Sequence, residues 1–313
     1  MRGRKAFSAG GAHPRSLKFR RPWEGPVEGR SRRRGRYAAE VARLTRTFDR
    51  SAARYERGRP GYPSAAVDFL AARFDLGPGS TILDLASGTG KFTRALRSTG
   101  AALLAVEPMP GMQREFQRAV PDVPVLPGRA DAIPLPDSFV DAVVVAQAFH
   151  WFHHVRALRE IARVLRPGGG LGLIWNNRDL TVPWVREYTR LVDRHGLPRP
   201  RRHEAWEAVF RRRSSPFGPV RRRVFPNPQY LTPDALVDRT LSESRVQAQP
   251  AAVRRVVERE LRVFLETHPS LRGRTRLAFP YETEVFYARK RASHPRRQRQ
   301  PAHFPAAGAA RPS

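Results

Sequence analysis

The chain has 313 residues, of which 58 are lysine or arginine and 28 are aspartate or glutamate, and its formal net charge is +30. This length accommodates one α/β domain and a smaller attached region. The chain has no cysteine, which excludes disulfides, thiolate zinc sites, cysteine nucleophiles and iron–sulfur clusters. We expect a cytoplasmic setting, because no apolar run approaches membrane-spanning length and the N-terminus lacks the apolar core of a secretion signal.

Both ends of the chain are basic and show little apolar periodicity. Residues 1–46 carry a net charge of +11 and residues 289–313 a net charge of +7, which leaves about +12 for the rest. We expect residues 1–46 and 291–313 to be disordered basic arms. Only 4 of the 58 basic residues are lysine, which indicates a GC-rich genome, because a phosphate-binding surface has no reason to avoid lysine. Nucleic acid is a partner that the arms allow but the composition does not favour.

Two hypotheses stay open for the N-terminal arm. It can be a true RNA-binding or organelle-targeting arm, or a misassigned extension whose native start is a non-ATG codon near Val41. The second hypothesis arises because no methionine falls between Met1 and Met109.

A cofactor loop is predicted at residues 81–93, TILDLASGTGKFT. The apolar residues around Asp84 indicate a buried strand, residues 86–90 form a small flexible turn, and a helix begins at Lys91. Such a turn lets a ligand lie against bare backbone while the helix end presents N–H groups, so the segment predicts a nucleotide-cofactor site. The alternative is an ordinary strand-to-helix connection with a capping carboxylate. A dinucleotide-binding loop has a third glycine where this chain has Thr93, which counts against NAD.

The second predicted strand, residues 101–106, is an apolar run that ends in Glu107. It suits a strand buried on both faces. An acid about twenty residues beyond the glycine loop is placed to accept hydrogen bonds from both hydroxyls of a ribose. The alternative, a solvated loop acid, fits less well after so long an apolar run.

Strands and helices continue to alternate beyond Glu107. Asp131, in a turn over the sheet edge, is placed to meet an adenine amino group, and His150 lies just beyond the fourth strand. This alternation predicts a parallel, doubly wound α/β sheet. The expected segments are a strand at 123–126, the turn at 128–136, a strand at 141–146, a helix at 155–165, a turn at 166–170 and a strand at 171–175.

Several stretches, taken in order, resemble the class I S-adenosylmethionine-dependent methyltransferases, in the branch called methyltransferase type 11. The resemblance covers about residues 48–289. It implies a Rossmann-like, mostly parallel seven-stranded sheet closed by an antiparallel C-terminal hairpin, a helical cap, and S-adenosyl-L-methionine as the methyl donor. The stretches are FDRSAARYERGRPGYP, ILDLASGTGKFT, VEPMPGM, GRADAIPLPDSFVDAVVVAQAFHWF, IARVLRPGGGLGLIWNNRD and PYETEVFYARK.

The resemblance also implies cofactor-binding roles for individual residues. The amino-acid part of the cofactor would lie against Asp84, Ala86, Gly88 and Gly90, and Glu107 would bind the two ribose hydroxyls. Met109 would pack on the adenine ring, and Asp131 and Ala132 would contact the edge of that ring. Gln147 would lie beside the methyl group that is transferred.

Two features qualify the resemblance. The family usually has glycine where this chain has Ala86, so either the Cβ displaces the cofactor slightly or the backbone does not need a positive φ there. In related enzymes a segment like residues 48–63 folds over the cofactor as a lid. Tyr55 would then offer its ring to the sulfonium and Arg59 would bind a carboxylate. The alternative is an amphipathic helix with surface arginines.

Methyl transfer from a sulfonium is an in-line displacement, so a base is required only if the acceptor must lose a proton. His150, His153 and His154 lie where such a base would sit, and His150 is the candidate. The alternative is that the His-Trp pair packs beneath the next helix, and we favour that structural role for Trp151. No carboxylate completes a metal-ligand set at familiar spacing around these histidines, so we expect no metal.

Residues 176–280 exceed what a minimal fold of this kind needs, and we expect them to cap the substrate pocket. The string NPQY at 227–230 is reminiscent of the Asn-Pro-Pro-Tyr motif of amino-group methyltransferases, but it lies some eighty residues too late, so we interpret it as a turn. The expected helices are 183–195, 203–211, 233–244 and 251–266, and the expected closing strands are 220–225 and 282–287.

The acceptor is the open question. A methyltransferase that acts on a small molecule is the first hypothesis. The alternatives are an RNA or protein methyltransferase that uses the basic arms, and a non-catalytic cofactor-binding protein or NAD-type enzyme. Fold alone does not identify the acceptor. We divide the chain into a basic arm at 1–46, a cofactor-binding core at 47–178, a cap with closing strands at 179–290 and a tail at 291–313.

Overall fold

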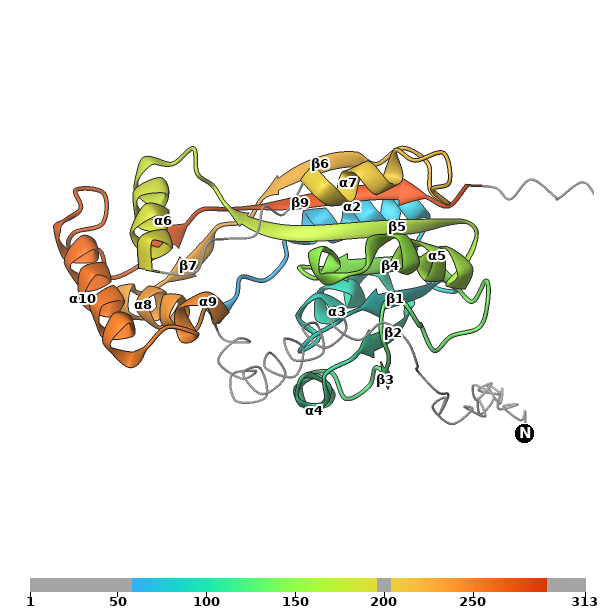
Figure 1. Cartoon of the computed structure of the whole chain (residues 1–313), viewed down its shortest axis with the longest axis horizontal. Coiled ribbons are helices and arrows are strands. Elements are labelled where there is room, and N and C mark those ends of the chain that lie inside the picture. The colour runs from blue at the N-terminus through green and yellow to red at the C-terminus, as the bar shows by residue number, and fades with distance from the viewer. Residues whose placement is uncertain (1–57, 196–203, 292–313) are drawn as a thin grey trace, which may run out of the picture. The chain divides into compact units, whose positions relative to one another are not determined.

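The computed structural model describes residues 58–195 and 204–291. Within these ranges, seven strands form one sheet in the order β3-β2-β1-β4-β5-β9-β6, and two more form a small separate sheet (Figure 1). The first five strands in that order pair in parallel, whereas β9 is antiparallel to both β5 and β6, which confirms the predicted sheet. The strands are β1 (Thr81–Leu85), β2 (Ala102–Glu107), β3 (Val125–Pro127), β4 (Val140–Ala146), β5 (Leu165–Arg178), β6 (Arg221–Pro226), β7 (Gln229–Leu231), β8 (Leu277–Phe279) and β9 (Tyr281–Arg289).

The helices expected after Lys91 are present with one difference, and the structure adds α2 and α4, which were not predicted. The segment expected at 233–244 ends earlier and is followed by a second short helix, because the Ser242 hydroxyl donates to the Arg239 carbonyl at 2.6 Å where the first helix stops. The helices are α2 (Ser64–Phe74), α3 (Lys91–Leu96), η1 (Arg97–Thr99), α4 (Pro110–Ala119), η2 (Phe149–Trp151), α5 (His154–Val164), α6 (Pro183–His195), α7 (Glu204–Phe210), α8 (Pro233–Leu241), α9 (Ser244–Gln247) and α10 (Ala251–Thr267).

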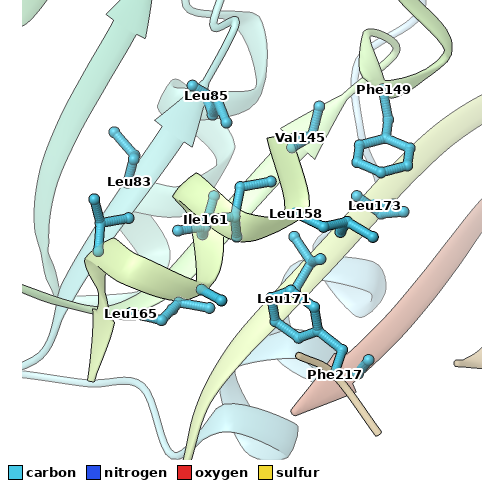
Figure 2. Close-up of a cluster of buried hydrophobic side chains, with 14 of the residues drawn as sticks. Leu83, Leu85, Val145, Phe149, Leu158, Ile161, Leu165, Leu171, Leu173 and Phe217 are labelled. Carbon is cyan, nitrogen blue, oxygen red and sulfur yellow. The ribbon is translucent and has the colours of Figure 1, made fainter. Parts of the chain in front are cut away.

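Alternating strand residues supply two separate hydrophobic cores on the two faces of the sheet. On β1, Leu83 and Leu85 face the core that α5 and α7 cover, while Ile82 faces the core that α2 and α3 cover. Figure 2 shows the first of these clusters, in which Leu158 and Ile161 of α5 lie against side chains of the strands. The sheet is thus buried on both faces, as its continuous apolar strands predict.

Helix α2 lies directly against β5 because that strand carries glycine at the contact. A Cβ on Gly170 would come within 2.3 Å of the Phe74 ring, closer than any real contact. The bare backbone therefore fixes the distance between helix and sheet.

β5 is longer than expected, and its first residues differ from the prediction. Residues 166–170 were expected to form a turn, and they instead lie inside the strand as an irregular stretch. The pairing with β4 moves from Val140↔Leu165 to Ala142↔Gly170, so most of the extra residues bulge out of the ladder. Gly168 has φ +75° in this bulge, which glycine adopts without strain.

The helices after β5 build a core of their own. Side chains of α6, α8 and α10 pack with β8 around Tyr188, Leu261 and Phe279, which are buried. This group is the predicted helical cap. β5 and β9 connect it to the main sheet, since their pairing continues as far as Arg178↔Tyr281.

Some expectations fall on residues that the structure does not describe. The arm at 1–46, the tail after residue 291 and Tyr55 lie outside the described residues. The boundary at 178/179 stays a prediction. Among the helices in residues 58–195 and 204–291, none combines the length and apolar character needed to cross a membrane.

Candidate active site

The loop after β1 crosses the carboxyl edge of the sheet between Ala86 and Gly90. The Ala86 N–H donates to the Val106 carbonyl at 2.7 Å, which ties the loop to β2. Gly88 has φ +58°, and a Cβ built on it would meet no atom within 4 Å. A Cβ on Gly90, by contrast, would lie 2.6 Å from the Val120 side chain. The loop is therefore open at Gly88 and closely packed at Gly90.

Asp84 lies within β1 and is almost completely buried. The Thr93 hydroxyl donates to its Oδ2 at 2.6 Å, while Oδ1 is buried without a hydrogen-bond partner among the residues that the structure describes. Burial raises the pKa of Asp84 to about 7, and the hydrogen bonds from Thr93 oppose that rise. An orphaned carboxylate oxygen in a buried place is suited to a ligand that brings an N–H or O–H group.

Glu107 ends β2 and is as deeply buried as Asp84. Its Oε2 accepts the Gly88 N–H at 2.9 Å, and its Oε1 accepts the Met109 N–H at 3.0 Å. Burial raises the pKa of Glu107 to about 7; the two backbone bonds lower it and the charge of Asp84 raises it further. Each oxygen can accept another donor, so the side chain joins the open loop to the start of α4 and still has capacity for a ligand.

Ala86 adopts φ +59°, the left-handed region that L-residues other than asparagine and aspartate rarely take. The alternative that the backbone does not need a positive φ at this position is therefore wrong. A non-glycine residue in this conformation carries a strain of about 1–2 kcal/mol.

The turn at 128–136 is held by side chains from α5. Arg129 Nε donates to Asp131 Oδ1 at 3.0 Å, and the Ala132 N–H donates to the Arg129 carbonyl at 3.0 Å. Arg163 of α5 donates to the Ile133 carbonyl at 2.9 Å. These bonds fix Asp131 and Ala132 beside the edge strand β3.

The end of β4 places Gln147 next to β5. Gln147 also has φ +59°, and its N–H donates to the Ile174 carbonyl at 2.8 Å. Its side-chain Nε2 lies 3.5 Å from the Asn176 carbonyl. A strained residue between the two central strands is typical of a functional position.

Past Gln147 the chain turns through η2, where one aromatic side chain is buried and another is exposed. Phe149 is buried and stacks on His154 at 5.1 Å, whereas Trp151 is 52 % exposed. The predicted packing of Trp151 beneath α5 is wrong, because Phe149 fills that space. His150 Nδ1 accepts a hydrogen bond from the Trp175 indole at 3.4 Å, which favours the tautomer with its proton on Nε2. Its role as a base stays a prediction.

Residues 58–63, which we call the strap, cross the same edge of the sheet. The side-chain amides of Asn176 and Asn227 each donate to the Gly61 carbonyl at 2.9 Å. Lys91, at the start of α3, donates to the Arg59 carbonyl at 2.9 Å. The strap is therefore attached both to the glycine-loop side and to the ends of β5 and β6.

Asn227 belongs to the NPQY string, and the interpretation of that string as a turn is only half right. Asn227 and Pro228 connect β6 to β7, but Gln229 and Tyr230 lie in β7 itself. The sequence did contain a signal, because Asn227 is a polar residue just beyond the end of a predicted strand. In the structure its Nδ2 donates to Asn176 Oδ1 at 3.2 Å. Asn176, too, was not predicted.

Arg59 lies near a buried ion cluster at the end of β5. Burial acts to raise the pKa of Glu243, but the charges of Arg178, Arg239, Arg59 and Arg245 hold it well below its usual range. Arg178 donates to Glu243 Oε1 in a buried salt bridge. No sequence pattern pointed to this cluster, because its members come from distant parts of the chain.

Known proteins resemble this chain in sequence and in fold. A family model described as a methyltransferase domain matches residues 83–173. An uncharacterized methyltransferase of Mycobacterium tuberculosis is 43% identical over 243 residues, 77% of this chain and 94% of that protein. An uncharacterized methyltransferase-like protein of Schizosaccharomyces pombe is 35% identical over 246 residues, 78% of this chain and 96% of that protein.

The chain belongs to the class I S-adenosylmethionine-dependent methyltransferases, in the type 11 branch. The fold agrees, because a solved structure of a proposed type II methyltransferase from Anaeromyxobacter dehalogenans matches with a TM-score of 0.55. It is 24% identical and covers 75% of this chain and 97% of that one. The chain is therefore an enzyme of known family, and the names of these two relatives do not state an acceptor.

The residues of this site fit the family's methyl donor. Asp84 Oδ1 and Ser87 Oγ are buried and have no hydrogen-bond partner in the described part of the chain, and the backbone at Gly88 is open. Asp84 and Glu107 are two buried carboxylates, suited to a ligand that carries a positive charge and several hydroxyl groups.

Proposed function

We propose that this methyltransferase transfers a methyl group from S-adenosyl-L-methionine to a small-molecule acceptor. The observation that supports the cofactor most directly is the pair of buried carboxylates, Asp84 and Glu107, beside the open backbone of Gly88. Burial opposes the charged form of both groups in the free protein, so a cationic, hydrogen-bond-donating ligand would stabilise them.

The loop residues would hold the amino-acid part of the donor. Asp84 Oδ1 would accept a hydrogen bond from its ammonium group, and Ala86, Gly88 and Gly90 would shape the backbone against which it lies. Glu107 would accept hydrogen bonds from the ribose hydroxyls while its two backbone bonds keep the carboxylate oriented. Charge-assisted hydrogen bonds of this kind contribute roughly 1.5–3 kcal/mol each.

The remaining proposed contacts lie on neighbouring strands. Met109 would pack on the adenine, and Asp131 and Ala132 would meet its edge from the turn that Arg163 holds. Gln147 would line the space beside the methyl group.

When bound, the donor supplies a methyl group on a sulfonium, which makes it reactive toward oxygen, nitrogen or carbon nucleophiles. The chain's own contribution is then to align the acceptor and exclude water, through the strap at 58–63, Tyr55 and Arg59. His150 would accept a proton only if the acceptor carries one, and it would have to do so through Nδ1, which Trp175 now engages. We propose no metal for this step, and a cytoplasmic setting stays a prediction.

Calorimetric titration with S-adenosyl-L-methionine, with NAD as comparator, tests the proposal. We expect the methyl donor to bind and NAD not to bind. Glu107→Gln is expected to weaken binding by roughly 10- to 100-fold, because it loses charge-assisted bonds to the ribose. Asp122→Asn removes an exposed carboxylate elsewhere and serves as the matched control. Binding of NAD alone, or no binding of the methyl donor to folded protein, would contradict the proposal.

A further inference from the structure

A buried ion cluster at the end of β5 has more positive than negative charge. The side chains of Arg178, Arg239 and Glu243 are 4%, 3% and 8% exposed. Glu243 Oε1 accepts a hydrogen bond from Arg178, and Glu243 Oε2 accepts one from Arg245 at 3.0 Å. Arg245 also pairs with Asp193 at the surface. The two deeply buried guanidinium groups therefore share one buried carboxylate.

Arg239 is the member of this cluster whose hydrogen-bonding groups are least satisfied. Among the described residues, its closest carboxylate contact is 3.7 Å to Glu243, beyond hydrogen-bond distance. Its Nε and Nη1 are buried and have no hydrogen-bond partner in that part of the chain. The guanidinium lies over the rings of Phe279 and Tyr281, 4.9 and 5.1 Å from their centres. Ring faces hold the cation in place but do not satisfy its N–H groups.

A second unsatisfied donor lies beside Arg239. The hydroxyl group of Tyr281 is buried and has no hydrogen-bond partner within residues 58–195 and 204–291, although tyrosine hydroxyls in protein interiors usually have one. A phenol and a guanidinium that both lack acceptors form a donor set for an anion. Because an uncompensated buried charge is costly, a bound anion would also stabilise the cluster.

The cluster adjoins the proposed site of methyl transfer. Arg178 follows Asn176 by two residues on β5, so both side chains leave the strand on the same face, about 7 Å apart. Asn176 contacts both Gln147 and the strap. At the start of the strap, Gly58 packs on Arg239, since a Cβ there would lie 3.5 Å from its Cγ. Asn176 and the strap therefore connect the cluster to Gln147.

We propose that Arg239 and Tyr281 bind a carboxylate group of the methyl acceptor, which is therefore a small organic acid. This inference rests on the proposed function and adds the acceptor's class to it. A carboxylate group fits the cluster, because its one negative charge balances the excess of one positive charge among Arg178, Arg239 and Glu243. The strap lies over Arg239, so the acid and the strap occupy neighbouring positions.

The test uses the full chain saturated with S-adenosylhomocysteine and follows binding of malonate and succinate by calorimetry at constant ionic strength. Malonamide and succinamide, which keep the shape without the charge, are the ligand controls, and inorganic phosphate is the third probe. We expect Arg239→Gln to weaken carboxylate binding at least 10-fold and Arg239→Lys to keep part of it. Arg262→Gln removes an exposed arginine on α10 and is the matched protein control. Titration with the methyl donor alone is run separately, so that failure of the cofactor site is seen on its own.

Each outcome decides the proposal. Carboxylate binding that is lost in Arg239→Gln but kept in Arg262→Gln supports it. Equal binding of the diamides, equal binding by Arg239→Gln, preference for phosphate, or no carboxylate binding by the intact protein overturns it. Should Arg239→Gln fail to fold, Tyr281→Phe removes only one hydroxyl and is expected to weaken carboxylate binding several-fold; unchanged binding in that variant overturns the proposal equally.

Discussion

Ala86 is a single residue in which the cofactor loop departs from the usual family pattern, and the structure gives the physical consequence. The backbone keeps the left-handed conformation, φ +59°, that glycine adopts freely. The alanine backbone is therefore strained. Its Cβ also occupies space beside the loop that a glycine would leave empty. Both effects act on a turn that the cofactor is proposed to contact.

Replacing Ala86 by glycine should relieve this strain. We expect Ala86→Gly to raise the free energy of unfolding by about 1 kcal/mol, less the entropy that glycine gains in the unfolded chain. Urea denaturation measures the change. Ala72→Gly, at an exposed position within α2, is the control and should lose about 1 kcal/mol. Similar losses in both variants would show that the loop is not strained.

If Asp84 and Glu107 contact the methyl donor as proposed, its binding should depend on pH. Burial raises the pKa of each to about 7, and a ligand that donates to the carboxylates should lower both values again. We therefore expect affinity for the methyl donor to rise from pH 5 to pH 7.5 and then level off, with protons released on binding. Calorimetry at pH 6.5 in buffers of different ionisation enthalpy measures that release. Proton uptake, or none, would contradict this assignment.

The same two carboxyl groups make the stability of the free protein depend on pH. Their pKa values are raised above the ordinary 3.8 and 4.5, so the folded state binds more protons between those values and pH 7. Their contribution to stability is complete below about pH 4 and is lost as the pH rises through 7. Glu107→Gln should make this decline shallower.

At the level of elements, the strap links parts of the chain that are far apart in sequence. Its Gly61 carbonyl is held by Asn176 at the end of β5 and by Asn227 after β6. Side-chain amides at strand ends, rather than a ladder of backbone hydrogen bonds, thus attach the strap to the sheet. Because side-chain hydrogen bonds attach it, we expect the strap to open without disturbing the sheet.

Removing one of these bonds should loosen the strap selectively. We expect Asn227→Ala to speed hydrogen exchange of residues 58–63 about fivefold, which corresponds to roughly 1 kcal/mol for one hydrogen bond. Exchange followed by mass spectrometry measures it. Asn177→Ala is the control, because that side chain donates to Glu284 of β9 rather than to the strap. Equal acceleration in both variants would refute a specific attachment.

The elements that sequence could predict are those with strong local patterns. The strands that contain Asp84 and Glu107 are apolar runs with a single acid at or near the end, and this pattern predicted both strands. The apolar face of the helix at 251–267 predicted that helix. The bulge at 166–170 was missed because an Arg-Pro-Gly-Gly-Gly string is typical of a turn. Pairing with β4 and with β9, both contacts between distant residues, keeps it in the strand.

The same limit explains which site residues were found. Asp84 and Glu107 belong to a local sequence motif. The other proposed contacts to the methyl donor come at the ends of the strands and turns that follow it along the chain, so they could be predicted. Arg178, Arg239 and Tyr281 meet only through folding of the cap, and no spacing between them carries a signal. The exposure of Trp151 depended on which of two nearby aromatic residues filled the space under α5, a matter of packing that its sequence leaves open.

Taken as a whole, the molecule carries much of its charge at its two ends. Residues 1–46 and 289–313 hold net charges of +11 and +7. If the acceptor is a small molecule, these arms contribute little to the reaction. If it is RNA, they would supply most of the affinity, and binding would fall steeply with salt.

Deleting residues 1–40 and 292–313 separates these cases. We expect the shortened chain to bind the methyl donor within twofold of the full chain, and this affinity to change little between 50 and 300 mM salt. Calorimetry at both salt concentrations measures it, with binding to an unrelated RNA as a comparison. Methylation that requires the arms and weakens steeply with salt would favour an RNA or protein acceptor instead.

The cap has a hydrophobic core of its own, distinct from the two cores of the sheet. The proposed donor contacts lie at residues 84–147, while Arg178, Arg239 and Tyr281 come from the later part of the chain. Mutations in the cap can therefore accumulate during evolution while the sheet and its donor site keep their structure. Descendants of one ancestral gene could in this way acquire new acceptors by changing one half of the protein, with the chemistry of the other half inherited intact.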